Sequence, residues 1–490
     1  MTWQGRYDTF FIGGKWVAPH SSQTVDVISP FTEQAIAKVP RASKADIDAA
    51  VAAARSAFDS GPWPRLSPDE RIETVLRLKT AFERRREELS QIITDEMGSP
   101  ISLSRAQQSI VPILMLEAQT TIARTFPWKE LRQGPTGNSL VVRQPKGVVA
   151  MIVPWNVPMM TTIQKLGPAL IAGCTVVLKP ALESPLSAYM LGEMLIEAGL
   201  PEGVVNIVPA DREESQHLAL HPGVDKVSFT GSTVAGRTLA AKCGELLRPI
   251  TLELGGKSAG IFLDDADIPA AVEFLRMGSF RNSGQICSLK TRILVSKKRE
   301  GEVVEALAHL IDSMPIGDPN ETDTQIGPMV SQRQQQRVEG YIDIGIKEGG
   351  RPVRGGAGRP KGLNHGWFVR PTLLAGVDPG SRIAQEEVFG PVLAVSTYEN
   401  EEEAIAIANN SDYGLSGSVF SADPERGVMV AERIRTGVVE VNGGGIGFHS
   451  PFGGVKLSGI GREGGREGFE PYVEIKSIGL PKAYADSLAS

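Results

Sequence analysis

The sequence predicts an α/β fold of more than one domain, and three observations carry this prediction. From Gly147 onward, short apolar strands alternate with helices, beginning with 148–153, 161–172 and 175–178. Strands that are apolar on both faces are typical of parallel sheets covered by helices on both sides. A second series of the same kind begins after Glu253. At 490 residues the chain is too long for one small core, so two or three domains are expected.

The first 126 residues are expected to form short strands and then helices. Turns join four strand-like runs, at 10–12, 15–17, 24–28 and 35–39. Ser43 is a typical N-cap for the first helix, and Ser67, followed by a proline and two acidic residues, opens the second. Further helix is expected as far as Glu96 and again from about 103 to 124.

Two segments differ from these helices and strands. Residues 127–146 alternate polar and apolar positions and contain glycine and proline, which predicts an extended, hairpin-like arm. The tail, residues 471–480, alternates again like a strand. Neither segment has a hydrophobic run that would form a core of its own.

Charge and composition exclude several classes of protein. The net charge of −6 gives no support to nucleic-acid binding, and the basic run 84–86 lies in an acidic helix. No apolar run is long and uninterrupted enough to cross a bilayer. Met1–Phe10 carries charges and lacks an apolar centre, so no signal peptide is expected. Three cysteines do not make a disulfide framework. We therefore expect a cytoplasmic protein without a membrane or nucleic-acid partner.

The histidines give no sign of a metal centre. The chain has six of them, and no paired spacing typical of zinc ligands was identified among them. No metal is therefore expected.

Cys287 lies in a short polar segment, 281–292, just before a strand-like run at 291–296. A thiol at the start of a strand is accessible to a substrate, and the two arginines and the lysine nearby are expected to favour the reactive thiolate. The alternative is a buried thiol that only packs, since free cysteine is among the most buried residue types. The segment alone leaves both interpretations open.

Two other polar residues follow buried strands. Asn156, in Pro154-Trp155-Asn156, comes directly after an apolar strand, where its amide would donate to an oxyanion. Glu253 lies between two leucines beside paired glycines, so desolvation is expected to raise its pKa toward that of a general base. The alternatives are a turn asparagine and a salt-bridged core glutamate.

A strand-to-helix turn spans Thr230-Gly231-Ser232-Thr233 and continues to Gly236. Gly231 lets the backbone approach a ligand, and Ser232 heads a helix whose free N–H groups favour a pyrophosphate. The turn is neither GxGxxG nor a Walker loop, and most serine N-caps only cap.

Together, in this order and at this length, these stretches resemble the aldehyde dehydrogenase superfamily over essentially the whole chain. Four more stretches match it: 203–206, 386–391, 450–454 and 458–463. The resemblance implies a Rossmann-like cofactor domain, an α/β catalytic domain and a small β oligomerisation arm. These correspond to 1–126 with 147–254, to 255–458, and to 127–146 with 459–490. An arm with open strand edges implies a homodimer or homotetramer.

The resemblance also implies a mechanism. Cys287 would attack the aldehyde, and the Asn156 amide would hold the oxyanion of the thiohemiacetal. Hydride transfer would leave a thioester, which Glu253 would hydrolyse through an activated water. Lys165 and Glu463 match positions that the family uses for proton transfer.

The cofactor implied is NAD or NADP. The matching cofactor-binding positions are Ile152, Val153, Pro154, Trp155, Lys179, Gly231, Ser232, Thr233, Gly236, Leu254, Glu387 and Phe389. Family members that prefer NAD commonly have a glutamate three residues after the lysine, whereas this chain has Leu182 there and Glu183 one place later. NADP is therefore conceivable, but NAD is favoured because no additional arginine accompanies Lys179. A second departure, Pro209-Ala210-Asp211-Arg212, replaces the family's glycine-rich turn near the adenine.

The expected substrate pocket has little bulk. Val157, Gln164, Ile286 and Ser288 stand at positions near the catalytic residues, and the loop 442–449 is rich in glycine. This favours a bulky, aromatic or long-chain aldehyde, although Phe448 would also fill space. Met159 and Met160 are candidates for contact with the substrate, although packing at a helix start is the expected role. No arginine is evident for a substrate carboxylate or phosphate.

Three other functions remain open. A CoA-acylating semialdehyde dehydrogenase would transfer the acyl group to coenzyme A, but such members tend to lack the glutamate that Glu253 supplies. A non-catalytic scaffold of the same fold would tolerate loss of the cysteine, the asparagine or the glutamate, and all three are present. A redox-sensing thiol would not need Asn156, Ser232 or Glu387.

Overall fold

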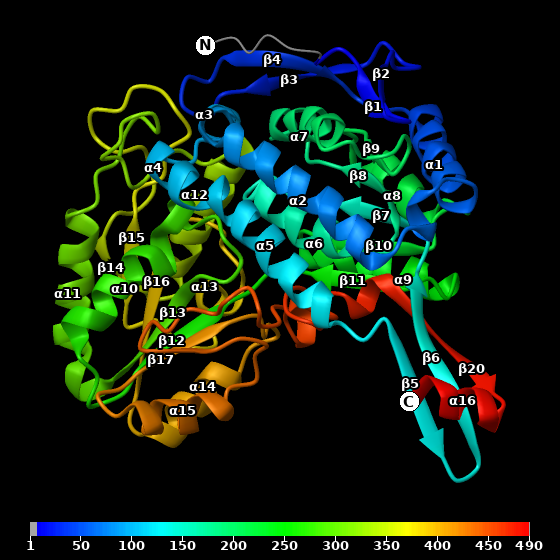
Figure 1. The fold of residues 1–490 in the computed structure, drawn as a ribbon. Coiled ribbons are helices and arrows are strands. Elements are labelled where there is room, and N and C mark those ends of the chain that lie inside the picture. Colours follow the sequence, from blue (N-terminus) through cyan, green and yellow to red (C-terminus); the bar gives the residue numbers. More distant parts are fainter. Residues whose placement is uncertain (1–6, 490) are drawn as a thin grey trace.

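The computed structural model describes residues 7–489. The interpretation of Met1–Phe10 as lacking a signal peptide concerns a segment whose first six residues lie outside this range. Two large sheets lie side by side, and a narrow arm projects from the lower right of the molecule (Figure 1). Within residues 7–489, no helix combines the length and apolar character needed to span a membrane.

The first sheet has eight strands in the order β19-β11-β10-β7-β8-β9-β1-β2. Its five central strands are parallel. β19 and β1 pair antiparallel with the outer two of these, and β2 pairs antiparallel with β1. The strands are β1 (Phe10–Ile12), β2 (Lys15–Val17), β7 (Val148–Ile152), β8 (Thr175–Lys179), β9 (Val205–Ile207), β10 (Lys226–Thr230), β11 (Ile250–Glu253) and β19 (Gly459–Ile460). β7 and β8 are buried along their whole length, as expected for strands covered on both faces.

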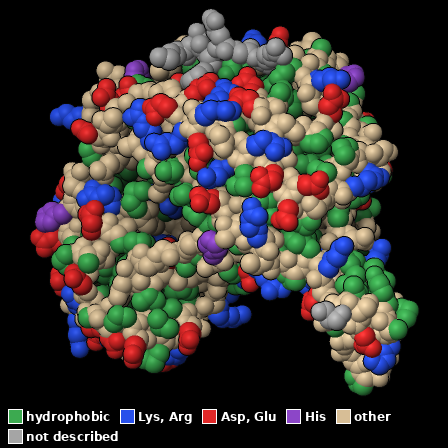
Figure 2. All heavy atoms as spheres, in the orientation of Figure 1, with side chains coloured by type: hydrophobic (Ala, Val, Ile, Leu, Met, Phe, Trp, Pro, Cys, Tyr) green, Lys and Arg blue, Asp and Glu red, His purple; other side chains and the backbone are tan. Residues whose placement is uncertain are grey.

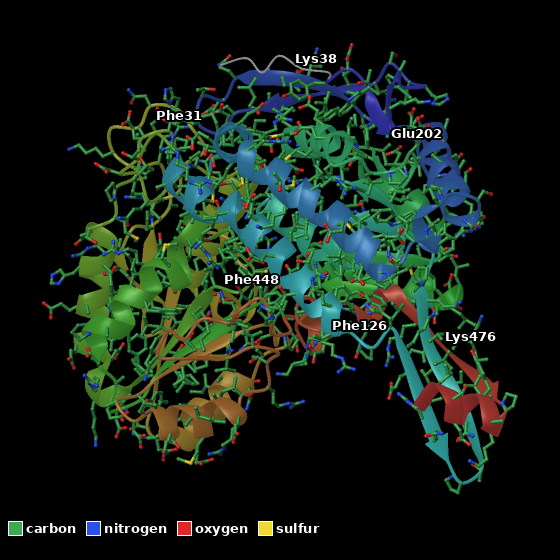
Figure 3. The ribbon with its side chains drawn as sticks, viewed as in Figure 1. Phe31, Lys38, Phe126, Glu202, Phe448 and Lys476 are labelled. Atoms are coloured by element: carbon green, nitrogen blue, oxygen red, sulfur yellow. The ribbon has the colours of Figure 1, made fainter. Side chains whose placement is uncertain are left out.

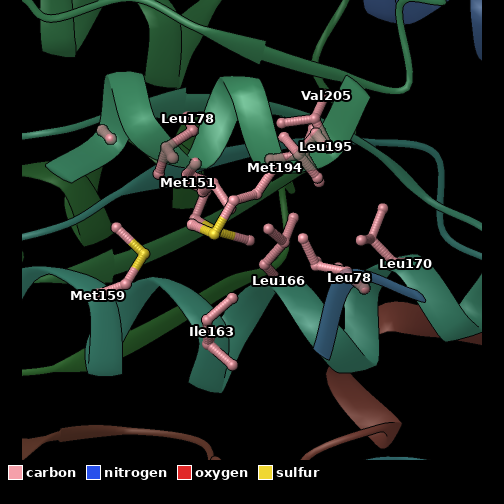
Figure 4. Packing of buried hydrophobic residues seen from close by; sticks show 14 of the residues in the cluster. Leu78, Met151, Met159, Ile163, Leu166, Leu170, Leu178, Met194, Leu195 and Val205 are labelled. Atoms are coloured by element: carbon pink, nitrogen blue, oxygen red, sulfur yellow. The ribbon is translucent and has the colours of Figure 1, made fainter. Parts of the chain in front are cut away.

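Helices cover both faces of this sheet. One face packs against α1 (Lys44–Asp59), α8 (Arg212–Leu220) and α9 (Thr233–Glu245). The other packs against α2 (Pro68–Arg84), α3 (Arg86–Met97), α5 (Ile110–Thr125), α6 (Pro158–Ala172) and α7 (Leu186–Glu197). Figure 4 shows part of this second core, where Ile163 and Leu166 of α6 lie opposite Met151 and Met194.

The predicted helix ends are confirmed, with one exception. Ser43 and Ser67 both cap through capping boxes, and Gly98 ends α3 in the left-handed conformation. The expectation of one continuous helix over 103–124 is wrong. The short α4 (Ile101–Leu103) runs into a π-helical turn at Ser104–Gln108, and α5 begins only at Ile110. Such turns often occur at functional sites because the extra residue redirects side chains.

The second sheet has seven strands in the order β14-β15-β16-β13-β12-β17-β18, all parallel except β14. The strands are β12 (Ser258–Phe262), β13 (Lys290–Ser296), β14 (Arg351–Arg354), β15 (Thr372–Ala375), β16 (Val392–Tyr398), β17 (Gly417–Phe420) and β18 (Glu440–Val441). Its helices are α10 (Ile268–Phe280), α11 (Glu300–Asp312), α12 (Gln332–Lys347), α13 (Arg382–Gln385), α14 (Glu401–Asn409) and α15 (Pro424–Glu432). The expected second α/β series is therefore present.

The arm consists of three antiparallel strands and a short helix. β5 (Lys129–Gly134) and β6 (Gly137–Pro145) form the predicted hairpin, and the C-terminal β20 (Val473–Leu480) pairs with β6 along its whole length. α16 (Lys482–Ala489) contacts β5 and β6. Phe126 lies where the arm joins the body, and Lys476 lies on the arm (Figure 3). A separate hairpin of β3 (Thr24–Ile28) and β4 (Ala35–Pro40) lies at the top of Figure 1.

Candidate active site

A cavity of about 830 Å³ collects most of the residues singled out from the sequence. Its lining includes Pro154, Trp155, Asn156, Gly231, Ser232, Thr233, Glu253, Leu254, Cys287, Glu387, Phe389 and Glu463. Most of these follow the carboxyl ends of parallel strands: β7 leads to Asn156, β10 to Ser232, and β11 ends at Glu253. Because neighbouring parallel strands end at the same edge of a sheet, residues distant in sequence meet there.

Five predicted site residues do not line this cavity. Ile152 and Val153 belong to the two hydrophobic cores of the first sheet. Gly236 packs against Leu254, and a Cβ there would lie 2.5 Å from Cδ2 of that leucine. Lys179 is buried at the end of β8, where desolvation lowers its pKa to about 8. The fifth, Lys165, is fully buried behind the cavity and forms an ion pair with Glu463.

Cys287 follows a tight turn in which Asn282 and Ser283 both have positive φ, at 53° and 56°. Its thiol is partly exposed to the cavity. Burial raises the pKa of this thiol to about 12, with smaller contributions from the carboxyls of Glu387 and Glu253. Arg281 acts in the opposite direction but does not outweigh them. The expectation that nearby cations favour the thiolate holds in direction for Arg281, but burial outweighs this effect.

The other two expected cations are bound by other protein groups. The Arg292 guanidinium donates to the carbonyls of Lys257 and Ala408, at 3.0 and 2.9 Å. Lys290 forms an ion pair with Glu440. Proximity in sequence therefore did not leave two free positive charges beside the thiol, because both cations are bound by other groups.

Asn156 is buried and held by amide groups on three sides. Its Nδ2 donates to the Gln285 carbonyl at 2.8 Å, two residues before Cys287. The backbone carbonyl of Asn156 accepts from Nε2 of Gln108 and from Nδ2 of Asn282, each at 3.0 Å. One of the two Nδ2 hydrogens is thus used to fix the side chain, and the second is available for a ligand.

Glu253 is buried, and neither carboxyl oxygen has a hydrogen-bond partner among residues 7–489. Burial raises its pKa well above the ordinary value, and the negative charge of Glu463 adds to this. Gly453 leaves room beside it, since a Cβ there would lie 2.5 Å from Oε1. The predicted upward shift is confirmed, and a salt-bridged core glutamate is excluded among the described residues.

Glu387 and Phe389 also line the cavity. Glu387 accepts from the Gly256 N–H at 3.1 Å, and burial raises its pKa to about 7. Phe389 has a φ of 63° and directs its ring edge-on toward Trp155, with 5.5 Å between centroids. This part of the cavity is therefore lined by two aromatic rings and one carboxyl group.

The substrate side of the cavity contains the expected Val157, Gln164, Ile286 and Ser288. Phe448 also lines it and lies near the middle of Figure 3. No sequence signal indicated several other lining residues, which include Met115, Gln119, Phe274 and Met277. Arg281 and Met160, both noted in the sequence, line the cavity as well. Met115 and Gln119 belong to α5, whose apolar pattern is that of an ordinary core helix. Met159 packs in the core as expected, whereas Met160 faces the cavity.

One arginine does reach the substrate side, so the expectation that none is placed for a polar substrate group is wrong. Arg281 ends α10 and lines the cavity. Met277 and Phe274 precede it by one and two helical turns and line the same wall.

The histidines are also paired, contrary to expectation. His217 and His221 lie one helical turn apart, and both approach Oδ1 of Asp48, at 2.6 and 3.4 Å. Nδ1 of His221, however, accepts the Gly223 N–H at 3.0 Å. In the neutral ring Nε2 then carries the proton and faces Asp48 as a donor. This protonation is opposite to that of a metal ligand, so the cluster is a hydrogen-bonded surface group.

Comparison with known proteins identifies the family. A sequence model described as the aldehyde dehydrogenase family matches residues 16–478, so the chain belongs to this family. It is 45% identical to geranial dehydrogenase of Castellaniella defragrans over 471 residues, covering 96% of this chain and 98% of that protein. It is 42% identical to 3-succinoylsemialdehyde-pyridine dehydrogenase of a Pseudomonas species, with the same coverage.

Solved structures share the whole fold. An aldehyde dehydrogenase of Mycobacterium tuberculosis in complex with NAD+ superimposes with a TM-score of 0.96 at 46% identity, covering 98% of this chain and 99% of that one. A mutant of aldehyde dehydrogenase C from Pseudomonas syringae, in complex with NAD+ and octanal, has a TM-score of 0.94 at 41% identity, with 96% of each chain covered. The two α/β units and the arm are thus the aldehyde dehydrogenase fold.

The high pKa of the Cys287 thiol predicts its reactivity without cofactor. Since the thiolate is the nucleophile, alkylation by iodoacetamide should accelerate about tenfold per pH unit from pH 7 to pH 9, without a plateau. Peptide mass spectrometry would measure this, with the buried Cys174 and Cys243 as internal controls. A plateau below pH 9 would contradict the prediction.

Proposed function

We propose that this protein oxidises an aldehyde to a carboxylic acid through a covalent thioester on Cys287, with NAD(P)+ as oxidant. The observation that carries the proposal is the convergence of three groups on one cavity: a thiol, the Asn156 amide and the unpaired Glu253 carboxyl. Family membership supports the same reaction. Each group performs one step.

Nucleophilic attack requires the Cys287 thiolate. Its thiol must first lose a proton, and Glu253 is the carboxyl in the cavity without a hydrogen bond to compete for it. The aldehyde oxygen then becomes an oxyanion. The free Nδ2 hydrogen of Asn156 and the backbone N–H of Cys287 are the donors for it, and because Asn156 is already held at Gln285, little reorganisation is needed.

Bound NAD(P)+ would accept the hydride released from the thiohemiacetal carbon. The chain offers a suitable cradle for it. Gly231 and Ser232 place a turn and the start of α9 at the cavity, where helix N–H groups favour a pyrophosphate. A carboxyl such as Glu387 suits ribose hydroxyls, and the apolar Phe389 suits the face of a ring. Lys179, buried and neutralised in part by desolvation, would contact the adenosine ribose.

Glu253 is suited to the final hydrolysis. A desolvated carboxyl with a raised pKa is basic enough to deprotonate a water, which then attacks the thioester. The proton must next leave a buried residue. Both members of the buried Lys165–Glu463 ion pair act on Glu253 through their charges. We propose that this pair receives the proton from Glu253.

The cofactor preference rests on few contacts. Leu182 removes the carboxylate that would repel a 2′-phosphate, and Glu183 instead pairs with Arg333 at 3.4 Å. These features permit NADP. The solved relatives described above carry NAD+, and no second cation accompanies Lys179, so we propose NAD as the main cofactor.

The substrate is proposed to be a larger, mainly apolar aldehyde. The substrate side of the cavity has apolar side chains from three helices, with Met115 from α5, Met160 from α6 and Phe274 and Met277 from α10. Geranial and octanal, which appear in the names of two relatives, are aldehydes of this kind. A short aldehyde would leave most of this apolar surface uncovered.

The alternatives are weaker. Transfer of the acyl group to coenzyme A would not need a general base, and Glu253 is positioned as one. A scaffold or a redox-sensing thiol would not need the Asn156 network or the buried Lys165–Glu463 pair, since unused buried charges only destabilise a fold.

Two substitutions test the mechanism. Cys287→Ala should abolish aldehyde oxidation and leave NAD binding intact. Glu253→Gln should release one equivalent of NADH per active site rapidly and then slow the steady rate by about 100-fold or more, because the thioester persists. Stopped-flow absorbance at the NADH band measures both phases. Normal steady turnover in Glu253→Gln would disprove its role as base, and equal rescue by coenzyme A would favour the acylating alternative.

A panel of straight-chain aldehydes from acetaldehyde to octanal, with a ring-bearing aldehyde added, tests the substrate class. Each methylene buried against the apolar wall should raise kcat/KM by about fourfold until the cavity is filled. Initial rates with NAD and NADP, measured separately, would also give the cofactor preference. A preference for acetaldehyde would contradict the proposed pocket while leaving the reaction class intact.

We also propose that the arm joins two copies of this chain. β20 is an edge strand of the arm, and Ile475, Ile478, Tyr484 and Leu488 expose apolar surface on β20 and α16. Apolar side chains are visible on the projecting arm in Figure 2. An open edge with apolar side chains favours pairing with another chain.

Ile475→Asp should weaken self-association at least tenfold, because it places a charge in the proposed interface. Sedimentation velocity over a range of concentrations would measure this. Lys476→Gln, at the neighbouring position on the same strand, is the matched control and should leave association unchanged. A wild-type protein that stays monomeric at all concentrations would disprove the proposal.

The cellular compartment is proposed from the thiols. All three cysteines are free, and a catalytic thiol would be oxidised and inactivated in an oxidising compartment. A cytoplasmic location is consistent with this, and fractionation of the source cells with a tagged chain would test it.

A further inference from the structure

Buried polar side chains form a stripe on one face of the first sheet. Successive residues of a strand point to opposite faces, so Lys226 and Ser228 share one face of β10. Thr251 and Glu253 share one face of β11 for the same reason. Ser228 lies beside Thr251 in the parallel register, which places both pairs on the same face. Each of the four is at most 4% exposed. This polar stripe leads from Glu253, at the carboxyl end of β11, toward the amino end of β10.

The same face of the neighbouring strand β7 is apolar. Its residues Val149 and Met151 lie beside the two stripe residues of β10, and both belong to the hydrophobic core. A polar group in such surroundings is unfavourable unless another group binds it. Packing alone would therefore favour apolar residues at the stripe positions as well.

Tyr472 covers the polar stripe. Its hydroxyl lies 3.2 Å from Oγ of Ser228, and its ring centroid lies 5.4 Å from Nζ of Lys226. Burial, and then the negative charge of Glu463, raise the pKa of Tyr472 well above its ordinary value. Glu463 is the partner of Lys165 in the ion pair that is proposed to receive the proton of hydrolysis. Tyr472 therefore lies close to Lys226 and within electrostatic reach of that ion pair.

Lys226 lacks the carboxylate partner that the neighbouring lysines have. Its Nζ donates to Oγ1 of Thr251 at 2.6 Å, and it forms no ion pair within residues 7–489. Lys146 and Lys165, in contrast, each pair with a glutamate. Burial lowers the pKa of Lys226 to about 7, and the positive charges of these two lysines act in the same direction. A lysine of this kind exchanges its proton near neutral pH.

The far end of the polar stripe approaches solvent at the base of the arm. Lys146 comes directly after β6, and its Nζ pairs with Glu474 of β20 at 2.9 Å. The Lys146 side chain is 13% exposed, and that of Glu474 is 60% exposed. Figure 1 shows β6 and β20 side by side where the arm leaves the body. Because Lys146 acts electrostatically on Lys226, the stripe leads from the site toward an exposed carboxylate.

We propose that the polar stripe carries the proton of thioester hydrolysis from the Lys165–Glu463 pair to Lys226 and then to solvent beside Glu474. In the hydrolysis, water gives one proton to Glu253, its oxygen bonds to the acyl carbon, and the electron pair of the C–S bond returns to sulfur. Glu253 has to lose this proton before the next turnover. The inference rests on the proposed aldehyde oxidation and adds the route by which its proton leaves.

The groups of the stripe suit this transfer. The hydroxyls of Tyr472, Ser228 and Thr251 act as relays, because a hydroxyl accepts one proton while it donates another. The neutral Lys226 amine accepts the proton and becomes neutral again when the proton passes to solvent. No net charge stays in the stripe after a turnover.

Lys226→Met tests the route through the lifetime of the acyl-enzyme. The protein is mixed with NAD+ and octanal and quenched in acid after set times, and the octanoyl adduct is measured by intact-protein mass spectrometry. The adduct should decay about tenfold or more slowly than in the wild type, because its proton has lost the acceptor. The burst of NADH should keep its rate, since hydride transfer precedes this step.

The effect of pH distinguishes proton transfer from a structural role. The neutral amine accepts the proton, and it predominates above the Lys226 pKa of about 7. The wild-type decay rate divided by that of Lys226→Met should therefore be largest above this pKa and approach one below about pH 6. Lys226 faces these other titratable groups: Lys146, Lys165, Cys174, Glu463 and Tyr472. All of them are present in both proteins, so the ratio isolates the contribution of Lys226.

Three further variants complete the test. Lys226→Arg keeps the positive charge but does not release a proton, so decay should stay slow. Tyr472→Phe removes one hydroxyl and keeps the ring, and it should slow decay by about threefold or more. Lys257→Met is the matched control, because burial also lowers the pKa of Lys257 to about 7 but this residue lies outside the stripe, before β12. It should leave the decay unchanged.

Full recovery in Lys226→Arg would show that only a positive charge is needed and would overturn the inference. A loss in Lys226→Met that is equal at all pH values would contradict it as well. Unchanged decay in Lys226→Met and Tyr472→Phe would mean that the proton leaves through the cavity instead. If Lys226→Met does not fold, Tyr472→Phe decides.

The wild type separates this inference from the proposed function. If it forms no acyl adduct, the proposed function fails, and the route fails with it. If it forms and hydrolyses the adduct while the variants decay at the wild-type rate, only the route fails.

Discussion

A buried network of amides joins the two halves of the molecule at the point where the chemistry is proposed. Asn156, at the end of β7, donates to the Gln285 carbonyl in the turn before Cys287. Gln285 in turn donates to Asn282 and accepts from the Val330 N–H. Because all these groups are buried, breaking one bond would leave an unpaired polar group at a cost of about 1–3 kcal/mol. The distance between strand end and thiol is therefore rigidly defined.

This rigidity allows the site to keep several titratable groups in an environment that disfavours their charged forms. The Glu253 and Glu387 carboxyls and the Cys287 thiol all have raised pKa values, and burial is the main cause for each. In the protein without ligands these groups favour their neutral forms. A bound cationic ring beside them would favour the thiolate, so cofactor binding would activate the proposed nucleophile. The Glu253 carboxyl has no hydrogen-bond partner among residues 7–489, which suits its proposed role as a base.

Much of the fold and site was predictable from local pattern. The β7–α6–β8 unit follows from uninterrupted apolar strands, and the caps at Ser43 and Ser67 follow from side chains that bond to their own helix. Cys287, Glu253 and Asn156 could be singled out because each is a reactive or polar residue beside a buried strand. Elements without such a signal were missed, including α12 and α16, whose polar residues dominate their sequences. The break between α4 and α5 was missed because no proline or glycine marks a π turn.

The sequence by itself determined the chemical types present, the strand ends that bear them and the family to which the chain belongs, because these depend on local spacing and composition. The tertiary structure decided which of them act together. Lys290 and Arg292 follow Cys287 closely in sequence, yet their charges are taken up by Glu440 and by backbone carbonyls. Arg281 and Lys290 both line the cavity, but only Arg281 does so without an ion pair among the described residues. The effect of one charge on another group depends on the distance between them and on their exposure to water. Neither quantity can be read from the order of residues.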